Sequence, residues 1–265
     1  MTLKLKVYVL VDNTASSNCN AEHGLSYLID FDKKILFDTG QSDLFLKNAK
    51  ILEAPLHEID TVVLSHGHYD HGNGLRYINN KTLICHPDIF LERFSGKQRK
   101  PVGLNLTQTD LRIRFNVKTY SEPYWLSDKM VYLGQIPRKF GYEKNETNFQ
   151  LENGDPDLLH DDSALAIKMS QGLFIISGCA HSGICNIIEH AKIITNEKHV
   201  FGVIGGFHLK FNNKQTQATL EYFKQNNIKV VMPSHCTELP ALAVFHSEFG
   251  GEQIKSGNLY TFDEE

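Results

Sequence analysis

Runs of apolar residues, some alternating with polar ones and some continuous, predict a series of short strands. Residues 3–11 alternate apolar and polar side chains, the period of a strand with one buried face. The run Thr61–Leu64 is apolar and rich in β-branched side chains, as in a strand buried on both faces. The other predicted strands cover residues 25–31, 35–37, 81–85, 111–117, 130–133, 164–169, 173–177, 200–204 and 228–232.

Apolar residues at helical spacing predict helices between these strands. Two of the predicted helices cover residues 42–52 and 216–225. A third follows Ser182, which would cap its N-terminus. Antiparallel pairs come early and strand–helix alternation recurs, so we expect an α/β fold with layers and mixed sheets. Residues 138–162 are polar and loop-like, which fits a lid or binding loop and equally a solvated insertion. We expect one domain over residues 1–265 that carries this candidate lid.

Composition and charge exclude several classes of protein. The chain has 265 residues, of which 41% are hydrophobic and 22% charged, as in globular proteins. A net charge of −4 without blocks of like charge argues against a dedicated nucleic-acid binder. No apolar run has the length of a membrane span, and the N-terminus lacks the apolar core of a signal peptide. With five scattered cysteines, these features predict a soluble cytoplasmic protein with no membrane partner.

Histidine is the unusual component, with 13 in the chain, and the densest cluster runs from His66 to His71. His66 and His68 directly follow a predicted buried strand, so both rings point the same way and can bind one metal. Asp70 and His71 follow at a predicted turn into a helix and can face a second metal. Imidazole and carboxylate ligands suit zinc, iron, manganese or nickel, and we expect two divalent ions, zinc being favoured.

Further candidate ligands follow three predicted strands of the second half. Cys179 and His181 follow residues 173–177, His208 follows residues 200–204, and His235 follows residues 228–232. Open α/β sheets place their sites at this edge, so the sequence predicts that His181 and His235 complete the metal shells. A single histidine at the end of a strand can equally have a structural role. For His208, both metal ligation and a structural role therefore remain possible.

The sequence resembles the metallo-β-lactamase fold superfamily, through the motif His66-x-His68-x-Asp70-His71. More narrowly, it is similar to the branch of 7,8-dihydropterin-6-methyl-4-(β-D-ribofuranosyl)aminobenzene 5′-phosphate synthase-like proteins. The match spans nearly the whole chain in order. The segments that carry it are residues 22–26, 36–42, 65–71, 161–165, 177–183, 205–209 and 234–237.

The resemblance implies a four-layer αββα sandwich of two mixed sheets, with a dinuclear metal site at one edge. It implies that metal 1 is held by His66, His68 and a later histidine. It likewise implies that metal 2 is held by Asp70, His71 and His235. Asp38 would orient the histidine loop through hydrogen bonds, as carboxylates that support metal ligands do.

The sequence departs from the wider superfamily at one metal ligand. Most members bridge both metals with an aspartate at a strand end, where this chain has Cys179, and a histidine precedes that strand, where this chain has Asp162. Either Cys179 or Asp162 could enter the shell or support it. His181 would then take the place of the missing histidine.

Other residues are candidates for substrate binding or proton transfer. Glu22 and His23 lie in a Gly-containing loop that overhangs the site in this fold, and plain surface residues are the alternative. Lys210 comes two residues after His208 and could bind a phosphate, although solvated charge is the default. Asp70 and His208 are the candidates for handling protons.

The leading hypothesis is a metal-dependent hydrolase that attacks a phosphoester, as a phosphodiesterase does, through a metal-bound hydroxide. The first alternative follows the branch: a transferase or synthase that joins a reduced pterin to a ribofuranosyl-aminobenzene phosphate. The second is a non-catalytic metal-binding protein, against which the intact histidine motif argues. The expected partner is a small, phosphorylated substrate.

Overall fold

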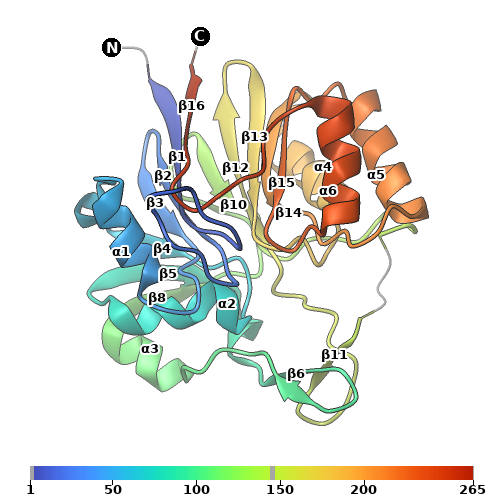
Figure 1. Ribbon diagram of the computed structural model, residues 1–265. Helices are drawn as coiled ribbons and strands as arrows, with labels where there is room; N and C mark the ends of the chain where they lie inside the picture. The colour runs from blue at the N-terminus through green and yellow to red at the C-terminus, as the bar shows by residue number, and fades with distance from the viewer. Residues whose placement is uncertain (1–2, 144–146, 265) are drawn as a thin grey trace.

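The computed structural model describes residues 3–143 and 147–264, in which two β-sheets pack face to face between outer layers of helices (Figure 1). Each large sheet contains both parallel and antiparallel pairs, and the first and last strands of the chain pair with each other. The predicted four-layer αββα sandwich of mixed sheets is confirmed.

The strands form two large sheets and one small one. In spatial order, the first sheet contains β16 (Leu259–Asp263), β1 (Lys4–Val11), β2 (Ser26–Asp30), β3 (Lys34–Phe37), β4 (Thr61–Val63), β5 (Lys81–Cys85) and β8 (Phe115–Thr119). The second contains β15 (Val230–Ser234), β14 (Val200–Gly206), β13 (Gly172–Ser177), β12 (Ala164–Met169), β10 (Met130–Tyr132) and β9 (Tyr124–Trp125). The small sheet contains β11 (Phe149–Leu151), β6 (Arg93–Ser95) and β7 (Lys100–Pro101).

In the described part of the chain, six α-helices cover the sheets and their edge. They are α1 (Leu44–Ile51), α2 (Tyr69–Gly72), α3 (Gln108–Arg114), α4 (Ile184–Thr195), α5 (Lys214–Gln225) and α6 (Leu239–Phe249), with 3-10 turns at Leu56–Glu58, Asn73–Tyr77 and Pro87–Phe90. Helices α1 and α3 lie on the first sheet, and α4, α5 and α6 on the second (Figure 1). Among the described residues, none of these helices combines the length and apolar composition needed to cross a membrane.

Central strands bury both of their faces because each large sheet is covered twice. On β3, Leu36 packs toward the helices of the first sheet, while its neighbour Phe37 packs between the two sheets. On β13, Ile175 packs toward α4, α5 and α6, while Ile176 packs between the sheets. Successive side chains of a strand point to opposite faces, so these continuous apolar runs fill two cores at once.

The predicted strand over residues 111–117 is wrong in its first half. Helix α3 runs through Arg114, and β8 begins at Phe115. A capping box starts this helix, because the Thr107 hydroxyl accepts the Asp110 N–H and the Asp110 carboxylate accepts the Thr107 N–H. Helix α6 and strand β16 also lie in segments for which the sequence predicts no element.

The predicted loop over residues 138–162 contains strand β11, which pairs with β6 in the small sheet. This sheet projects below the sandwich on the side of the second sheet (Figure 1). Residues 144–146 of the candidate lid lie outside the described residues. Its role as a lid stays a prediction.

Ser182 does not cap α4 as predicted, because its hydroxyl donates to the carboxylate of Asp162 at 2.6 Å. The first turn of α4 is capped instead by Glu143, which accepts the N–H groups of Cys185 and Asn186, each at 2.8 Å. A buried carboxylate thus serves the helix N-terminus from a distant segment. Burial raises the pKa of Glu143 to about 7, although these two hydrogen bonds favour the charged form.

We expect the pH dependence of stability to change in a Glu143→Gln variant. The folded pKa of Glu143 is raised, so its contribution to the free energy of unfolding is present below about pH 4.5 and lost as pH rises through about 7. Urea unfolding of both metal-free proteins should show the wild-type stability falling relative to the variant by about 3 kcal/mol over this range. The exposed Glu152→Gln variant is the matched control, and a constant difference between wild type and Glu143→Gln would contradict the prediction.

Candidate metal centre

The candidate ligands follow strands that end at one edge of the sandwich. In the first sheet, parallel strands β3 and β4 are followed by Asp38 and His66. In the second sheet, parallel strands β13, β14 and β15 are followed by Cys179, His208 and His235. Parallel strands bring their carboxyl ends to the same edge, so segments far apart in the sequence meet there.

Asp38 fixes the loop that carries His66 to His71. Its fully buried carboxylate accepts three hydrogen bonds of 2.7 Å, from the N–H of Ser65, the hydroxyl of Ser65 and Nδ1 of His71. Because the Asp38 carboxylate accepts a hydrogen bond from Nδ1–H of His71, the ring hydrogen stays on Nδ1. Nε2 of His71 therefore presents its lone pair to the site. Asp38 therefore lies where a residue that orients the histidine loop must lie.

The first ligand set contains three imidazoles. Nε2 of His66 lies 2.9 Å from Nδ1 of His68. One ring nitrogen from each of His66, His68 and His181 lies within 4.8 Å of the other two. Nε2 of His181 and Nε2 of His68 are buried and have no hydrogen-bond partner among the described residues. Burial lowers the pKa of all three histidines, to about 3 for His68, so the rings are neutral and their lone pairs can bind a metal.

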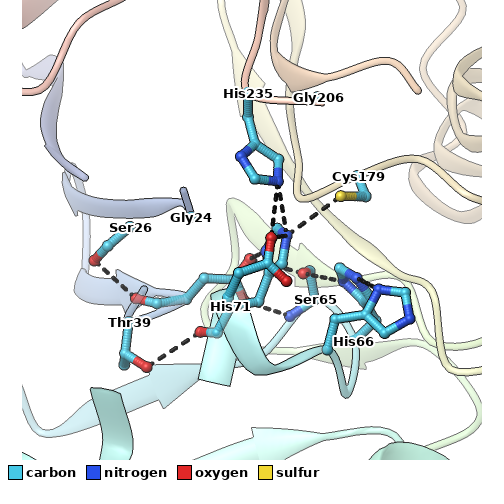
Figure 2. A network of polar contacts seen from close by, with 12 residues as sticks. Gly24, Ser26, Thr39, Ser65, His66, His71, Cys179, Gly206 and His235 are labelled. Atoms are coloured by element: carbon cyan, nitrogen blue, oxygen red, sulfur yellow. Dashed lines mark hydrogen bonds and ion pairs between the residues drawn. The ribbon is translucent and has the colours of Figure 1, made fainter. Parts of the chain in front are cut away.

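The second ligand set contains a carboxylate and two imidazoles. Nε2 of His71 and Nε2 of His235 lie 3.1 Å apart (Figure 2). Oδ2 of Asp70 lies 3.7 Å from the first of these nitrogens and 3.4 Å from the second. Two nitrogen ligands of a tetrahedral zinc ion lie about 3.3 Å apart, so this spacing fits a divalent metal.

The charges of the second set also favour a cation. Burial alone would raise the pKa of Asp70, but His71 and His235 outweigh it and hold this pKa well below its usual range. Burial would lower the pKa of His235, but its hydrogen bond to Asp70 raises it to about 9. Asp70 therefore keeps its negative charge although it is buried, which favours binding of a cation by this set.

Cys179 touches both ligand sets. Its Sγ lies 3.2 Å from Nε2 of His71, and it belongs with His66 and His71 to a group whose ligand atoms lie within 4.8 Å of one another (Figure 2). Asp162 lies elsewhere: its Oδ2 accepts the N–H of Ser182 at 2.8 Å and the hydroxyl of Ser182 at 2.6 Å. Asp162 thus supports the loop that carries His181, while Cys179 lies among the candidate ligands.

The other candidate residues differ in their contacts with the candidate ligands. His23 is half exposed; its Nε2 lies 3.3 Å from Oδ2 of Asp70 and its ring stacks on His235. Glu22 instead uses its carboxylate to hold the loop before α1, by accepting from Gln41 and Ser42. Lys210 is exposed in the segment after β14. The ring of His208 lies 4.3 Å from that of His181.

Sequence reasoning missed a buried ion-pair cluster beneath the histidine loop. Arg93 is fully buried and donates to Asp157 at 2.6 Å and to Asp161 at 2.8 Å. The same Asp161 carboxylate accepts the N–H of Gly67 at 2.7 Å, between the ligands His66 and His68. A Cβ on Gly67 would lie 2.4 Å from the Arg93 guanidinium, so only glycine fits there.

Two further contacts to the ligands come from other segments. Phe149 of β11 places its ring 4.7 Å from that of His68 and 5.5 Å from that of His181. Oδ1 of Asn13 lies 3.1 Å from Nδ1 of His235 and accepts its hydrogen bond. Nε2 of His235 is therefore left free to bind a metal. Asn13 follows β1, so the rule that polar residues beyond strand ends form the site could have found it. The sequence holds no comparable signal for Phe149 or Arg93.

Comparison with known proteins agrees with this geometry. A family model described as the metallo-β-lactamase superfamily matches residues 20–86, which include the histidine loop. The chain is 36% identical over 246 residues to an uncharacterized protein of Methanocaldococcus jannaschii, covering 89% of this chain and 92% of that protein.

Two further proteins match nearly the whole chain. It is 31% identical over 287 residues to the 7,8-dihydropterin-6-methyl-4-(β-D-ribofuranosyl)-aminobenzene-5′-phosphate synthase of M. jannaschii, covering 97% of each. Among solved structures, Tm1679, a metal-dependent hydrolase of the β-lactamase superfamily, superposes with a TM-score of 0.87 at 31% identity. That superposition covers 97% of this chain and 98% of the other.

We expect an Asp38→Asn variant to fold but to bind metal about 10–100-fold more weakly. Asparagine tolerates the left-handed backbone of Asp38 (φ 56°) and can still accept from the N–H of Ser65. Its amide would face Nδ1–H of His71, which favours moving that hydrogen to Nε2 and blocks ligation. Competition with a chromophoric chelator measures the affinity, and the exposed Asp32→Asn variant is the control. Equal affinities for wild type and Asp38→Asn would contradict the assignment.

An Arg93→Met variant should lose about 3–5 kcal/mol of unfolding free energy, because it leaves Asp157 and Asp161 buried without a cation. Urea unfolding of the metal-free protein, followed by circular dichroism, measures the loss. The exposed Arg112→Met variant should stay within about 0.5 kcal/mol of the wild type. A loss below about 1 kcal/mol for Arg93→Met would mean that the two carboxylates find other partners or protonate at little cost.

Proposed function

This chain belongs to the metallo-β-lactamase superfamily, and from that premise we propose that it is a metal-dependent hydrolase that acts on a phosphoester. The observation that carries the proposal is the pair of adjoining ligand sets at one edge of the sandwich. They consist of His66, His68 and His181, and of Asp70, His71 and His235.

Divalent ions held by these sets, zinc by preference, would supply Lewis acidity and would activate water for attack on the ester. The residues of the chain prepare the site for this chemistry. Asp38 keeps the hydrogen of His71 on Nδ1, and Asn13 does the same for His235, so both present Nε2. Asp70 stays ionised and acts as a ligand, which leaves His208 as the candidate for proton transfer. Cys179 takes the place of the usual bridging aspartate.

The substrate is proposed to be a small phosphorylated molecule. His23 is half exposed and lies against Asp70 and His235, where it can contact a bound ester. Lys210 offers an exposed cation for a phosphate beyond His208. Phe149, from the candidate lid, offers an aromatic face beside His68 and His181 on which a planar group could stack. We propose that the lid exerts its effect through this ring.

A second candidate function is synthesis of the bond between a reduced pterin and a ribofuranosyl-aminobenzene phosphate. The relative in M. jannaschii named for that product shares 31% identity with this chain over nearly its whole length. The aromatic face of Phe149 suits a pterin as well as a phosphoester that carries an aromatic ring. The two functions use the same ligands and differ in the group that accepts the transfer.

We also propose a reducing compartment, the cytoplasm, as the place of action. All five cysteines are free thiols, and Cys179 lies among the metal ligands, where it can bind a metal only while it is reduced.

Protein purified without chelator should contain at least two divalent ions per chain by elemental analysis and should hydrolyse bis(p-nitrophenyl) phosphate. A His66→Ala variant should lose metal and fall by roughly 100-fold in kcat, since metal ions supply several kcal/mol of transition-state stabilisation. His57→Ala, at a highly exposed position, is the matched control and should keep both properties.

Consumption of a reduced pterin and a ribofuranosyl-aminobenzene phosphate donor without phosphodiester hydrolysis would favour the synthase instead. A protein that takes up no metal even after reconstitution would contradict both functions and leave a non-catalytic role.

A further inference from the structure

A second cluster of metal-binding side chains lies beside the two ligand sets. Cys179, His208 and Cys236 each lie two residues beyond the end of a strand, after β13, β14 and β15 respectively. These strands are parallel neighbours in the second sheet. The two sulfur atoms and one ring nitrogen of His208 lie within 4.8 Å of one another.

The backbone around this cluster is shaped to hold it. A Cβ on Gly206 would lie 2.5 Å from Sγ of Cys236 and 2.5 Å from the carbonyl oxygen of Gly178, so the glycine leaves room for the sulfur. Cys236 also donates from Sγ to the carbonyl oxygen of Cys179 at 3.3 Å. His208 adopts a left-handed backbone (φ 52°), an uncommon conformation for a residue with a side chain.

One buried nitrogen of the cluster is unsatisfied in its hydrogen bonding among the described residues. Nδ1 of His208 is buried and has no hydrogen-bond partner within the described part of the chain. Buried polar atoms nearly always have a hydrogen-bond partner. An imidazole nitrogen without one, beside two thiols, therefore indicates that the ring is positioned to bind a metal ion.

We propose that Cys179, His208 and Cys236 bind a third metal ion, a thiophilic divalent ion such as zinc, next to the dinuclear centre. Two sulfurs and one imidazole nitrogen are a soft donor set that prefers zinc or cadmium to magnesium or manganese. Three protein ligands leave the fourth tetrahedral position open. The third ion shares Cys179 with the proposed dinuclear centre, because a thiolate sulfur has more than one lone pair. An imidazole has two ring nitrogens, so ligation through one of them leaves the other for the proton transfer proposed for His208.

The test titrates Co²⁺ and Cd²⁺ into chelator-stripped protein kept reduced with a phosphine. The wild type should bind three ions per chain, with the thiolate-to-cobalt charge-transfer absorption that nitrogen and oxygen ligands lack. Cys236→Ser should bind two ions and show a weaker band, because one thiolate remains. Cys19→Ser removes a thiol that lies outside the cluster, and this matched control should behave as the wild type.

An unchanged stoichiometry and band in Cys236→Ser would overturn the proposal. A His66→Ala/His68→Ala variant separates this inference from the proposed function, because it removes the three-histidine set and leaves the cluster intact. Binding of a thiolate-ligated ion that depends on Cys236 in this variant supports the third site by itself. Two ions in the wild type, neither affected by Cys236→Ser, would support the dinuclear centre and contradict the third site.

Discussion

The site depends on one buried carboxylate, that of Asp38, which accepts hydrogen bonds from Ser65 and His71 at the end of β3. A buried charge is costly unless donors surround it, and the donors are groups of the histidine loop itself. The loop can therefore satisfy Asp38 only in the conformation that also turns Nε2 of His71 toward His235. The same hydrogen bonds that satisfy the buried charge of Asp38 thus also orient His71.

Three strand ends of the second sheet face this loop, and each is followed by a residue with a left-handed backbone conformation. His208 and His235 have left-handed backbone conformations, with φ values of 52° and 50°, and Ala180 has φ 56°. Such residues cost of order 1–3 kcal/mol each and persist only where the surroundings over-determine them. Here the surroundings are the apolar cores on both faces of β13 and β14. The stability of those cores compensates for the backbone strain that points these side chains at the candidate metal ligands.

Local pattern was enough to predict most strands and the loop from His66 to His71, because alternation and strand-end position are properties of neighbouring residues. The bounds of β5 agree with the prediction to the residue. Pairings between distant segments could not be predicted in this way. The cap of α4 by Glu143 and the ion pairs of Arg93 join residues more than 40 positions apart, and no local spacing encodes them. For the same reason the sequence left Cys179 and Asp162 as alternatives, which only their positions in the fold distinguish.

The departure at Cys179 has a chemical consequence for the whole edge of the second sheet. An aspartate there would add a hard oxygen ligand, whereas a cysteine adds a soft sulfur and brings with it the thiol of Cys236. Sulfur ligands shift the preference of a site toward zinc and away from magnesium or manganese. They also make the site dependent on a reducing environment, because an oxidised thiol cannot ligate. In the proposed metal centre, the identity of one residue beyond β13 therefore determines both the preferred metal and the redox conditions under which that metal can bind.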